Sequence, residues 1–494
     1  MWHALSNRSP LVSSADGAPV CRVILLATLL WLSGVLCRAE ETLEVGFAHV
    51  DITPAVNAET PVWLAGYYPG RAATGVHDPL YARCVVLKTG TEKLAWVSVD
   101  LIGLQFPEVQ RLRARLRDFR YVLVASTHNH EGPDVIGVWG QSFLHRGVDD
   151  QYVASVVVRL EQVVRQAEQR LREARAWYGT AADDALLGDS RLPVVKDGVL
   201  RLLRFTSPHD DAVTGLIVQW NCHPEALGGD NQLMTADFPA STIAALERRY
   251  ACPVVYFTGA IGGLLAPPRD RVRNEQGELL QEGDFEFARR YGEEVAQLAM
   301  RANEGAQPIR LMPFQVSAAR TGIPMTNELY RWARLLGVLR REAYAWNGEV
   351  AALGEPLRSV RAGATSAIET EVACLRLGEL YVAAMPGELF PELVRGPVED
   401  PAQPGADYPE SPIEPLLTDI VPGDKWLLFG LANDEVGYIM PRRQWDRQPP
   451  YAYGLSAPQY GEINSCGPDV APVIMRSLQA RVAELWDGLP ERPQ

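Results

Sequence analysis

The sequence predicts a mixed α/β fold in which several layers of β-sheet are flanked by helices. The first observation is that short apolar and β-branched runs, typical of buried strands, alternate after residue 43 with longer segments of helical periodicity. The second is that no change of composition marks a linker between residues 43 and 488. We therefore expect these strands and helices to form one domain of catalytic size.

The expected elements follow one another along the whole chain. Strand-like runs occupy residues 94–99, 122–125, 216–220, 254–257 and 380–385. Apolar residues at helical spacing predict helices with a core-facing side over residues 151–175, 285–302, 328–345 and 471–486. Six prolines punctuate residues 396–415 and predict an irregular surface loop.

The first 39 residues differ from the rest of the chain. Arg22 precedes fourteen mostly apolar residues (23–36), and a Cys-Arg-Ala sequence ends at Ala39. This pattern predicts a secretory signal peptide over residues 1–39 with cleavage after Ala39, so that residues 40–494 form the mature domain. An uncleaved anchor is the alternative, but the run is shorter than the roughly 20 residues of a spanning helix. We expect a secreted or periplasmic protein without a stable membrane span.

Composition narrows the classes of partner. The chain has 47 Lys and Arg residues against 61 Asp and Glu residues, a net charge of −14, and no basic run. Phosphate backbones are held by basic patches, so we expect no nucleic-acid partner. Five widely spaced cysteines remain after the signal segment, without a CxxC pair, which predicts mostly buried thiols and at most two disulfides.

Two histidines follow the end of a predicted strand in the stretch YVLVASTHNHEGPD (121–134). At such an end, His128 and His130 can face one side of the sheet as metal ligands or as acid/base groups. The alternative is a pair of loop histidines bonded to backbone carbonyls. The residues of this stretch alone leave both interpretations open.

His223 and Glu388 follow two other predicted strands. All eight histidines lie in the first half of the chain, so oxygen ligands must complete any metal site. Zinc in hydrolytic sites commonly takes histidine nitrogens and a carboxylate, and keeps a position for water. Glu388 offers a carboxylate at a Pro-Gly turn after a strand, although a solvated turn glutamate is the alternative.

Together these phrases resemble the neutral ceramidase family of zinc amidases. The phrases are STHNHEGP (126–133), NCHP (221–224), PGE (386–388), ANDEVGY (432–438) and YGEINSCGP (460–468). They occur in order within a likeness that covers roughly residues 43–485. The resemblance implies the catalytic domain of that family, and because the chain stops at 494 we expect no following β-sandwich domain.

The resemblance also implies roles for particular residues. Zinc would be held by four residues, namely His128, His223, Glu388 and Tyr438. His130 would manage the proton of a zinc-bound water. Arg191 would stabilise the developing oxyanion at the substrate carbonyl, with a surface salt bridge as the alternative. Tyr460 would line the substrate site, with a packed core tyrosine as the alternative.

The chain departs from the family pattern in two phrases. Family ceramidases carry a serine before a proline after the glycine-rich turn, whereas this chain has Ala266 before Pro267. A mechanism that needs the serine cannot operate, but attack by zinc-bound water can. Asn129, Glu131 and Asp134 replace small and hydroxylated residues, and this extra acid predicts a more polar substrate.

These observations predict an exported zinc-dependent hydrolase that cleaves the amide bond of an N-acyl lipid such as ceramide, a sphingolipid, or a related N-acyl compound. One alternative is a metal-dependent amidohydrolase of another family, such as a barrel with His-x-His at a strand end, although no histidine follows His223. Another is a non-catalytic zinc-binding or scaffold protein of the same fold.

Overall fold

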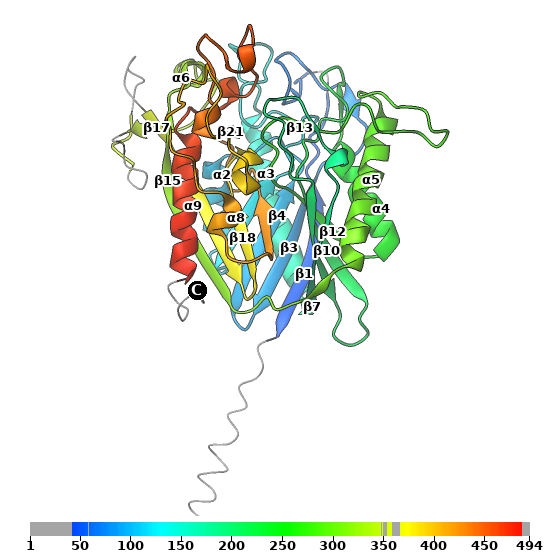
Figure 1. Cartoon of the computed structure of the whole chain (residues 1–494). Coiled ribbons are helices and arrows are strands. Elements are labelled where there is room, and N and C mark those ends of the chain that lie inside the picture. Colours follow the sequence, from blue (N-terminus) through cyan, green and yellow to red (C-terminus); the bar gives the residue numbers. More distant parts are fainter. Residues whose placement is uncertain (1–41, 58, 347, 349–352, 358–365, 487–494) are drawn as a thin grey trace, which may run out of the picture. The chain divides into compact units, whose positions relative to one another are not determined.

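Three mixed five-stranded sheets form the framework of the computed structural model (Figure 1). The structure describes residues 42–486 except 58, 347, 349–352 and 358–365, so the expected signal peptide lies outside the described residues.

The first sheet has the order β5-β4-β3-β1-β6, with β1 (Leu43–Asp51), β3 (Tyr81–Thr89), β4 (Glu92–Val99), β5 (Tyr121–Ser126) and β6 (Arg172–Glu173). The second has the order β12-β10-β9-β7-β14, with β7 (Arg175–Ala182), β9 (Val199–Thr206), β10 (Val213–Trp220), β12 (Val254–Thr258) and β14 (Gln307–Ile309). The third has the order β15-β17-β18-β20, with β15 (Phe314–Met325), β17 (Ser366–Leu377), β18 (Leu380–Ala384) and β20 (Trp426–Phe429), and β16 (Tyr344–Ala345) pairs with β17.

Each of the three sheets contains one parallel strand pair. These pairs are β4 with β5, β10 with β12, and β18 with β20, whereas the other pairings inside the sheets are antiparallel. Because the strands of a parallel pair end at the same edge, each sheet presents two carboxyl ends together. Short pairs lie beyond the sheets: β2 (Gly75–Val76) with β11 (Leu233–Met234), β8 (Gly188–Asp189) with β13 (Leu265–Ala266), and β19 (Glu388–Leu389) with β21 (Tyr438–Ile439).

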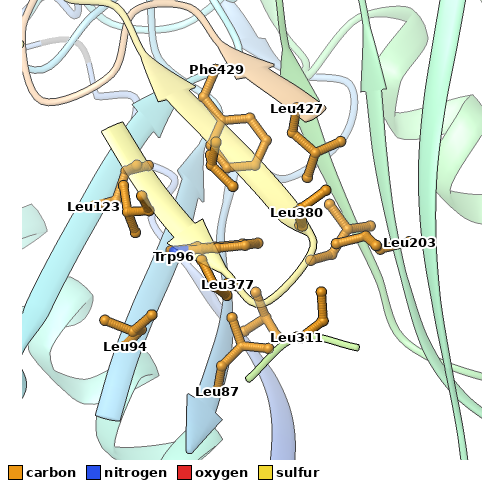
Figure 2. Close-up of a cluster of buried hydrophobic side chains, with 14 of the residues drawn as sticks. Leu87, Leu94, Trp96, Leu123, Leu203, Leu311, Leu377, Leu380, Leu427 and Phe429 are labelled. Carbon is orange, nitrogen blue, oxygen red and sulfur yellow. The ribbon is translucent and has the colours of Figure 1, made fainter. Parts of the chain in front are cut away.

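The central core lies where the three sheets face one another. Figure 2 shows leucines and aromatic side chains from all three meeting there, among them Trp96 of β4, Leu203 of β9 and Phe429 of β20. The edge-on contact of the Trp96 and Phe429 rings, with centroids 5.5 Å apart, joins the first sheet to the third. This core fixes the sheets relative to one another and therefore fixes the positions of their strand ends.

Helices cover the outer faces of the sheets. The eight described α-helices are α2 (Phe106–Arg115), α3 (Asp150–Gln169), α4 (Phe238–Tyr250), α5 (Phe285–Glu304), α6 (Glu328–Leu335), α7 (Glu392–Arg395), α8 (Leu417–Ile420) and α9 (Val470–Trp486). α2 and α3 pack on the first sheet, α4 and α5 on the second, and α9 on the third (Figure 1). On β4, Trp96 therefore faces the central core while Ala95 and Val97 face the helices, which explains why the predicted strand runs are continuously apolar.

The predicted mixed α/β class is confirmed, and the five predicted strand runs fall in β4, β5, β10, β12 and β18. The predicted buried thiols are confirmed, because the five described cysteines are buried and free. The helix expected over 328–345 is wrong in its length and its burial. It ends at Leu335 because Gly337, at a φ of 74°, turns the chain, and none of its residues is buried. No helix in the described part of the chain is both long and apolar enough to cross a bilayer.

Candidate metal and active site

Strand ends from the three sheets are hydrogen-bonded to one another at one place. The amide of Ser126, at the end of β5, donates to the carbonyl of Leu431 over 3.1 Å. The amide of Leu431 donates to Gly387 after β18 over 3.2 Å, and Gly430 donates to Thr258 at the end of β12 over 2.9 Å. These backbone hydrogen bonds bring together the ends of β5, β12, β18 and β20.

His128 and His223 are held in the same way by backbone carbonyls. Nδ1 of His128 donates to Ile102 O over 2.7 Å, and Nδ1 of His223 donates to Leu265 O over 2.9 Å. His128 has a φ of 67°, a left-handed conformation that few non-glycine residues adopt. Both side chains are buried. Because Nδ1 is used in each ring, Nε2 is the atom that each ring directs at the site, as in metal-binding histidines.

Glu388 lies between these two imidazoles. Its Oε2 is 2.9 Å from Nε2 of His223 and 3.4 Å from Nε2 of His128. Burial alone would raise the pKa of Glu388, but the two imidazoles hold that pKa well below its usual range. The carboxylate is therefore an anion in a buried site, directly between two potential nitrogen ligands.

His130 is the third histidine of the cluster, and its ring is held in place by neighbouring residues. Its Nδ1 lies 3.0 Å from Oε1 of Glu225, and the ring of Tyr67 contacts it edge-on at 5.1 Å between centroids. A Cβ added at Gly66 would come within 2.5 Å of the His130 ring, so this position requires glycine. Burial lowers the pKa of His130, against the opposing effect of the Glu225 carboxylate. The carboxylate itself has its pKa lowered to about 2, because the raising effect of burial is outweighed by His130 and His223.

Three buried imidazoles could therefore hold a metal ion. One ring nitrogen each of His128, His130 and His223 lies within 4.8 Å of the others, and this is the only such group among the described residues. Neither ring nitrogen of His130 makes a well-directed hydrogen bond within the described part of the chain. The donor set, which combines imidazole nitrogens with the Glu388 carboxylate, fits a zinc-like cation.

Tyr438, the fourth expected ligand, lies beside this cluster. It pairs with Glu388 in the parallel bridge between β19 and β21, so its position is fixed by the same backbone. Burial, reinforced by the Glu388 carboxylate, raises its pKa well above the usual value for tyrosine. In the metal-free protein the Tyr438 phenol is therefore neutral.

The site opens into an apolar cavity of about 560 Å³. The buried residues His128, His130, Glu388 and Tyr438 line it, and half-exposed Tyr460 lines it too. Most other lining residues are apolar, among them Ile102, Ile136, Val138, Trp139, Met325, Leu329 and Ile368. A cavity of this size and lining suits an extended apolar group such as an acyl chain.

Arg191 does not line this cavity. Its guanidinium is buried and donates to both carboxylate oxygens of Glu462, at 2.8 and 3.1 Å, and to the carbonyl of Tyr460 at 2.7 Å. Arg191 therefore holds the segment that carries Tyr460. The expected contact of Arg191 with a substrate carbonyl stays a prediction, and the same holds for the substrate role of Tyr460.

The acidic residues that follow the two histidines have binding partners inside the protein. Glu131 forms a buried ion pair of 2.6 Å with Arg71, and Asp134 accepts from the backbone amides of Ile136, Gly137 and Trp139. Neither acid lines the cavity. The expectation that these acids make the substrate more polar therefore loses its basis, because the cavity wall is mainly apolar.

Sequence reasoning missed Glu225 and Tyr67, which hold the ring of His130. For Glu225 a signal was present, since it lies two residues after His223 in the phrase HPE and can share that side of the chain. For Tyr67 there was none, because its segment is far from both histidines in sequence and lacks a strand pattern.

The chain has a ceramidase-like fold. Among solved structures, neutral ceramidase from Pseudomonas aeruginosa matches with a TM-score of 0.65 at 17% sequence identity, over 92% of this chain and 76% of that chain. A ceramidase complexed with C2 matches with a TM-score of 0.65 at 16% identity, over 92% and 77%. No protein-family model and no curated protein matches the chain. The expected resemblance is thus confirmed as a likeness of fold, and the three-sheet architecture gives no support to the barrel alternative.

Proposed function

We propose that the protein is an exported, zinc-dependent hydrolase that cleaves the amide bond of an N-acyl lipid. The observation that carries this proposal is that His128, His130 and Glu388 line an apolar cavity of about 560 Å³, with buried His223 directly behind Glu388. Polar groups in the wall of an apolar cavity suit a substrate with a long acyl chain and a central amide. Export follows from the expected signal peptide.

In this proposal His128, His223, Glu388 and Tyr438 hold the zinc ion. When bound, zinc supplies Lewis acidity that lowers the pKa of a coordinated water to about 7 and polarises the amide carbonyl. The carbonyls of Ile102 and Leu265 keep the Nδ1 protons of the two histidines, which leaves both Nε2 lone pairs for the ion.

His130 moves the proton in the proposed reaction. Glu225 contacts Nδ1 of this ring, so Nε2 is free to take a proton from the attacking water. As the carbon–oxygen bond forms and the carbon–nitrogen bond breaks, Nε2 returns this proton to the departing amine. The clamp of Gly66 and Tyr67 on the ring reduces the reorientation that would otherwise accompany each transfer.

The direct test is fatty-acid release from a short-chain N-acyl sphingosine by the purified mature protein. The measurement is made with and without a zinc chelator, and again after zinc is restored. Turnover that disappears with the chelator and returns with zinc supports the proposal. Absence of turnover by protein that contains stoichiometric zinc contradicts it.

Ala266 favours a second candidate, a non-catalytic zinc-binding protein of the same fold. Ala266 lies on β13 directly after Leu265, whose carbonyl accepts from His223, so the missing hydroxyl lies near the expected centre. A protein that binds zinc but hydrolyses neither the sphingosine amide nor simpler N-acyl amines would support this candidate. Replacement of Ala266 by serine is the informative variant, because gain of turnover would assign the loss to that hydroxyl.

A further inference from the structure

Helix α6 carries an apolar stripe that the described part of the chain leaves exposed. Leu329 and Trp332 in α6, and Leu336 directly after its end, are at helical spacing and are 52%, 60% and 54% exposed. None of the eight residues of α6 is buried. The helices α3 and α9, by contrast, bury their apolar residues against sheets. An uncovered apolar stripe of this size is unusual on a soluble surface and marks an interaction site.

The helix is firmly attached to the candidate site. Asn327 caps α6 by accepting from the amides of Leu329 and Tyr330 over 2.9 and 3.4 Å. The amide group of the same side chain donates to the carbonyls of Ile463 and Ser465, each over 2.8 Å. The stripe is therefore a fixed part of the surface, next to the segment that carries Tyr460.

A turn with two more exposed apolar residues lies at the same cavity. Phe143 and Leu144 are 76% and 67% exposed, in a turn that is stabilised by Ser142 and His145, whose Oγ and Nδ1 atoms lie 2.7 Å apart. Both residues line the cavity that also contains Leu329, Trp332 and Leu336. We call these five residues the apolar rim: Phe143, Leu144, Leu329, Trp332 and Leu336. In Figure 1, α6 lies at the same end as β13 and β21, which carry parts of the candidate site.

An exposed arginine, Arg340, follows the apolar rim residues of segment 328–341 in a protein of net charge −14. The segment 328–341 contains four arginines and a single acid, Glu328. Arg341 is paired with buried Asp434, and Arg331 and Arg334 are half-buried, so Arg340 is the exposed cation of this segment. Arg340 is exposed, and its 3.0 Å partner Asp150 is exposed as well, so this pair is weak and screened by salt. Exposed tryptophan and leucine beside arginine is the composition of helices that lie in the interface of anionic bilayers.

We propose that the apolar rim docks the protein on a lipid surface that contains anionic lipid. Leu329, Trp332 and Phe143 would enter the acyl-chain boundary, and the exposed guanidinium of Arg340 would contact anionic headgroups. The mouth of the cavity then faces the bilayer, so an acylated molecule passes from lipid into an apolar cavity without crossing water. This last step rests on the proposed function, whereas docking does not.

Vesicle flotation with the purified mature chain tests the docking. We expect binding to vesicles of equal parts phosphatidylcholine and phosphatidylglycerol, and weaker binding to phosphatidylcholine alone. The variant Phe143→Ser/Trp332→Ser should lose about tenfold or more of the binding to anionic vesicles. The matched control Val158→Ser/Leu279→Ser removes two apolar residues of 49% and 48% exposure outside the rim, and should bind as the unchanged protein does.

The charge contribution is tested separately with Arg340→Ser, which should reduce the preference for anionic vesicles and leave binding to phosphatidylcholine unaltered. Thermal unfolding of each variant establishes that it is folded, as expected for exposed positions. The proposal is overturned if the unchanged protein binds neither vesicle, or if rim and control variants bind equally. The proposal is also overturned if light scattering shows that the unchanged protein is a dimer and that the rim variant is a monomer. The surface would then bind a second copy of the chain.

Failure of docking and failure of the proposed function give different results. Protein that floats with vesicles but releases no fatty acid would support the docking proposal and contradict the proposed activity. Protein that hydrolyses a soluble short-chain amide but does not float would support the activity and contradict the docking proposal.

Discussion

Glu225 and His130 form a buried contact, with Oε1 of the acid 3.0 Å from Nδ1 of the imidazole. The two residues come from different sheets, because His130 follows β5 and Glu225 follows β10. This contact leaves Nε2 as the ring atom that can reach a substrate or a metal ion. The chemistry of the site depends on whether Nε2 of His130 acts on the substrate or binds the metal ion.

Replacement of His130 decides between proton transfer and metal binding. We expect His130→Gln to keep its zinc and to lower kcat by about 100- to 10,000-fold, because a general acid/base group contributes this much. Zinc content and turnover are measured on the same preparation. Glu225→Gln, which keeps shape and removes charge, should give a smaller loss with zinc retained. Loss of zinc from His130→Gln would instead make His130 a ligand.

Replacement of Glu388 or Tyr438 tests the proposed oxygen ligands. We expect Glu388→Ala and Tyr438→Phe each to weaken zinc binding by about tenfold or more, since each removes a ligand. Zinc occupancy is measured by elemental analysis after dialysis at limiting zinc. Glu435→Gln is the matched control, because Glu435 lines the same cavity and has no assigned role as a ligand. Full occupancy in both ligand variants would rule out the assignment.

The buried ion pair of Arg191 and Glu462 predicts a stability effect. Arg191→Met leaves the Glu462 carboxylate buried without its cation, which should reduce the free energy of unfolding by about 3–5 kcal/mol. Arg191→Met/Glu462→Gln removes both charges and should recover part of this loss in denaturant unfolding. If the double variant is as unstable as the single one, the ion pair is not the cause. A stable double variant that lacks turnover would assign Arg191 a role toward substrate.

The raised pKa of Glu392, a residue outside the candidate metal site, predicts that the free energy of unfolding depends on pH. Burial, with the neighbouring charge of Asp189, raises the pKa of Glu392 from 4.5 to about 8. The folded protein therefore binds this proton more tightly than the unfolded chain, so the contribution of Glu392 is complete below pH 4.5. It is lost as pH rises towards about 8, at about 1 kcal/mol per pH unit or less.

Glu392→Gln mimics the protonated group and should remove this dependence. We expect the variant to gain stability over the unchanged protein at pH 8 and to differ little at pH 4.5, as measured by denaturant unfolding at both values. Parallel pH profiles for the two proteins would show that Glu392 ionises normally in the folded state.

Sequence patterns located the polar residues of the site because each follows a buried strand. The runs before His128, His223 and Glu388 are apolar on both sides, and a breaker or polar residue then ends each strand. What the residues alone could not supply was the way the sheets meet. Contacts such as Arg191 with Glu462, 271 positions apart, depend on that arrangement and leave no local pattern.

Helix α6 shows the limit of periodicity as a guide to burial. The spacing of Leu329, Trp332 and Leu336 is the same whether a sheet, a membrane or water lies against it, so the pattern predicts a helix but not its neighbour. The acids Glu131 and Asp134 failed as a guide to the substrate for a similar reason. Their partners, Arg71 and backbone amides, come from the tertiary fold.

The joining of strand ends from three sheets has a consequence for the order of assembly. His128 and His223 are synthesised well before Glu388 and Tyr438, yet all four reach one place only when β18 and β20 have docked on the earlier sheets. A chain that stops after its second sheet has nitrogen donors without the carboxylate between them. Binding of the proposed ion would therefore come late in folding, and it would stabilise the finished chain but not its partly folded precursors.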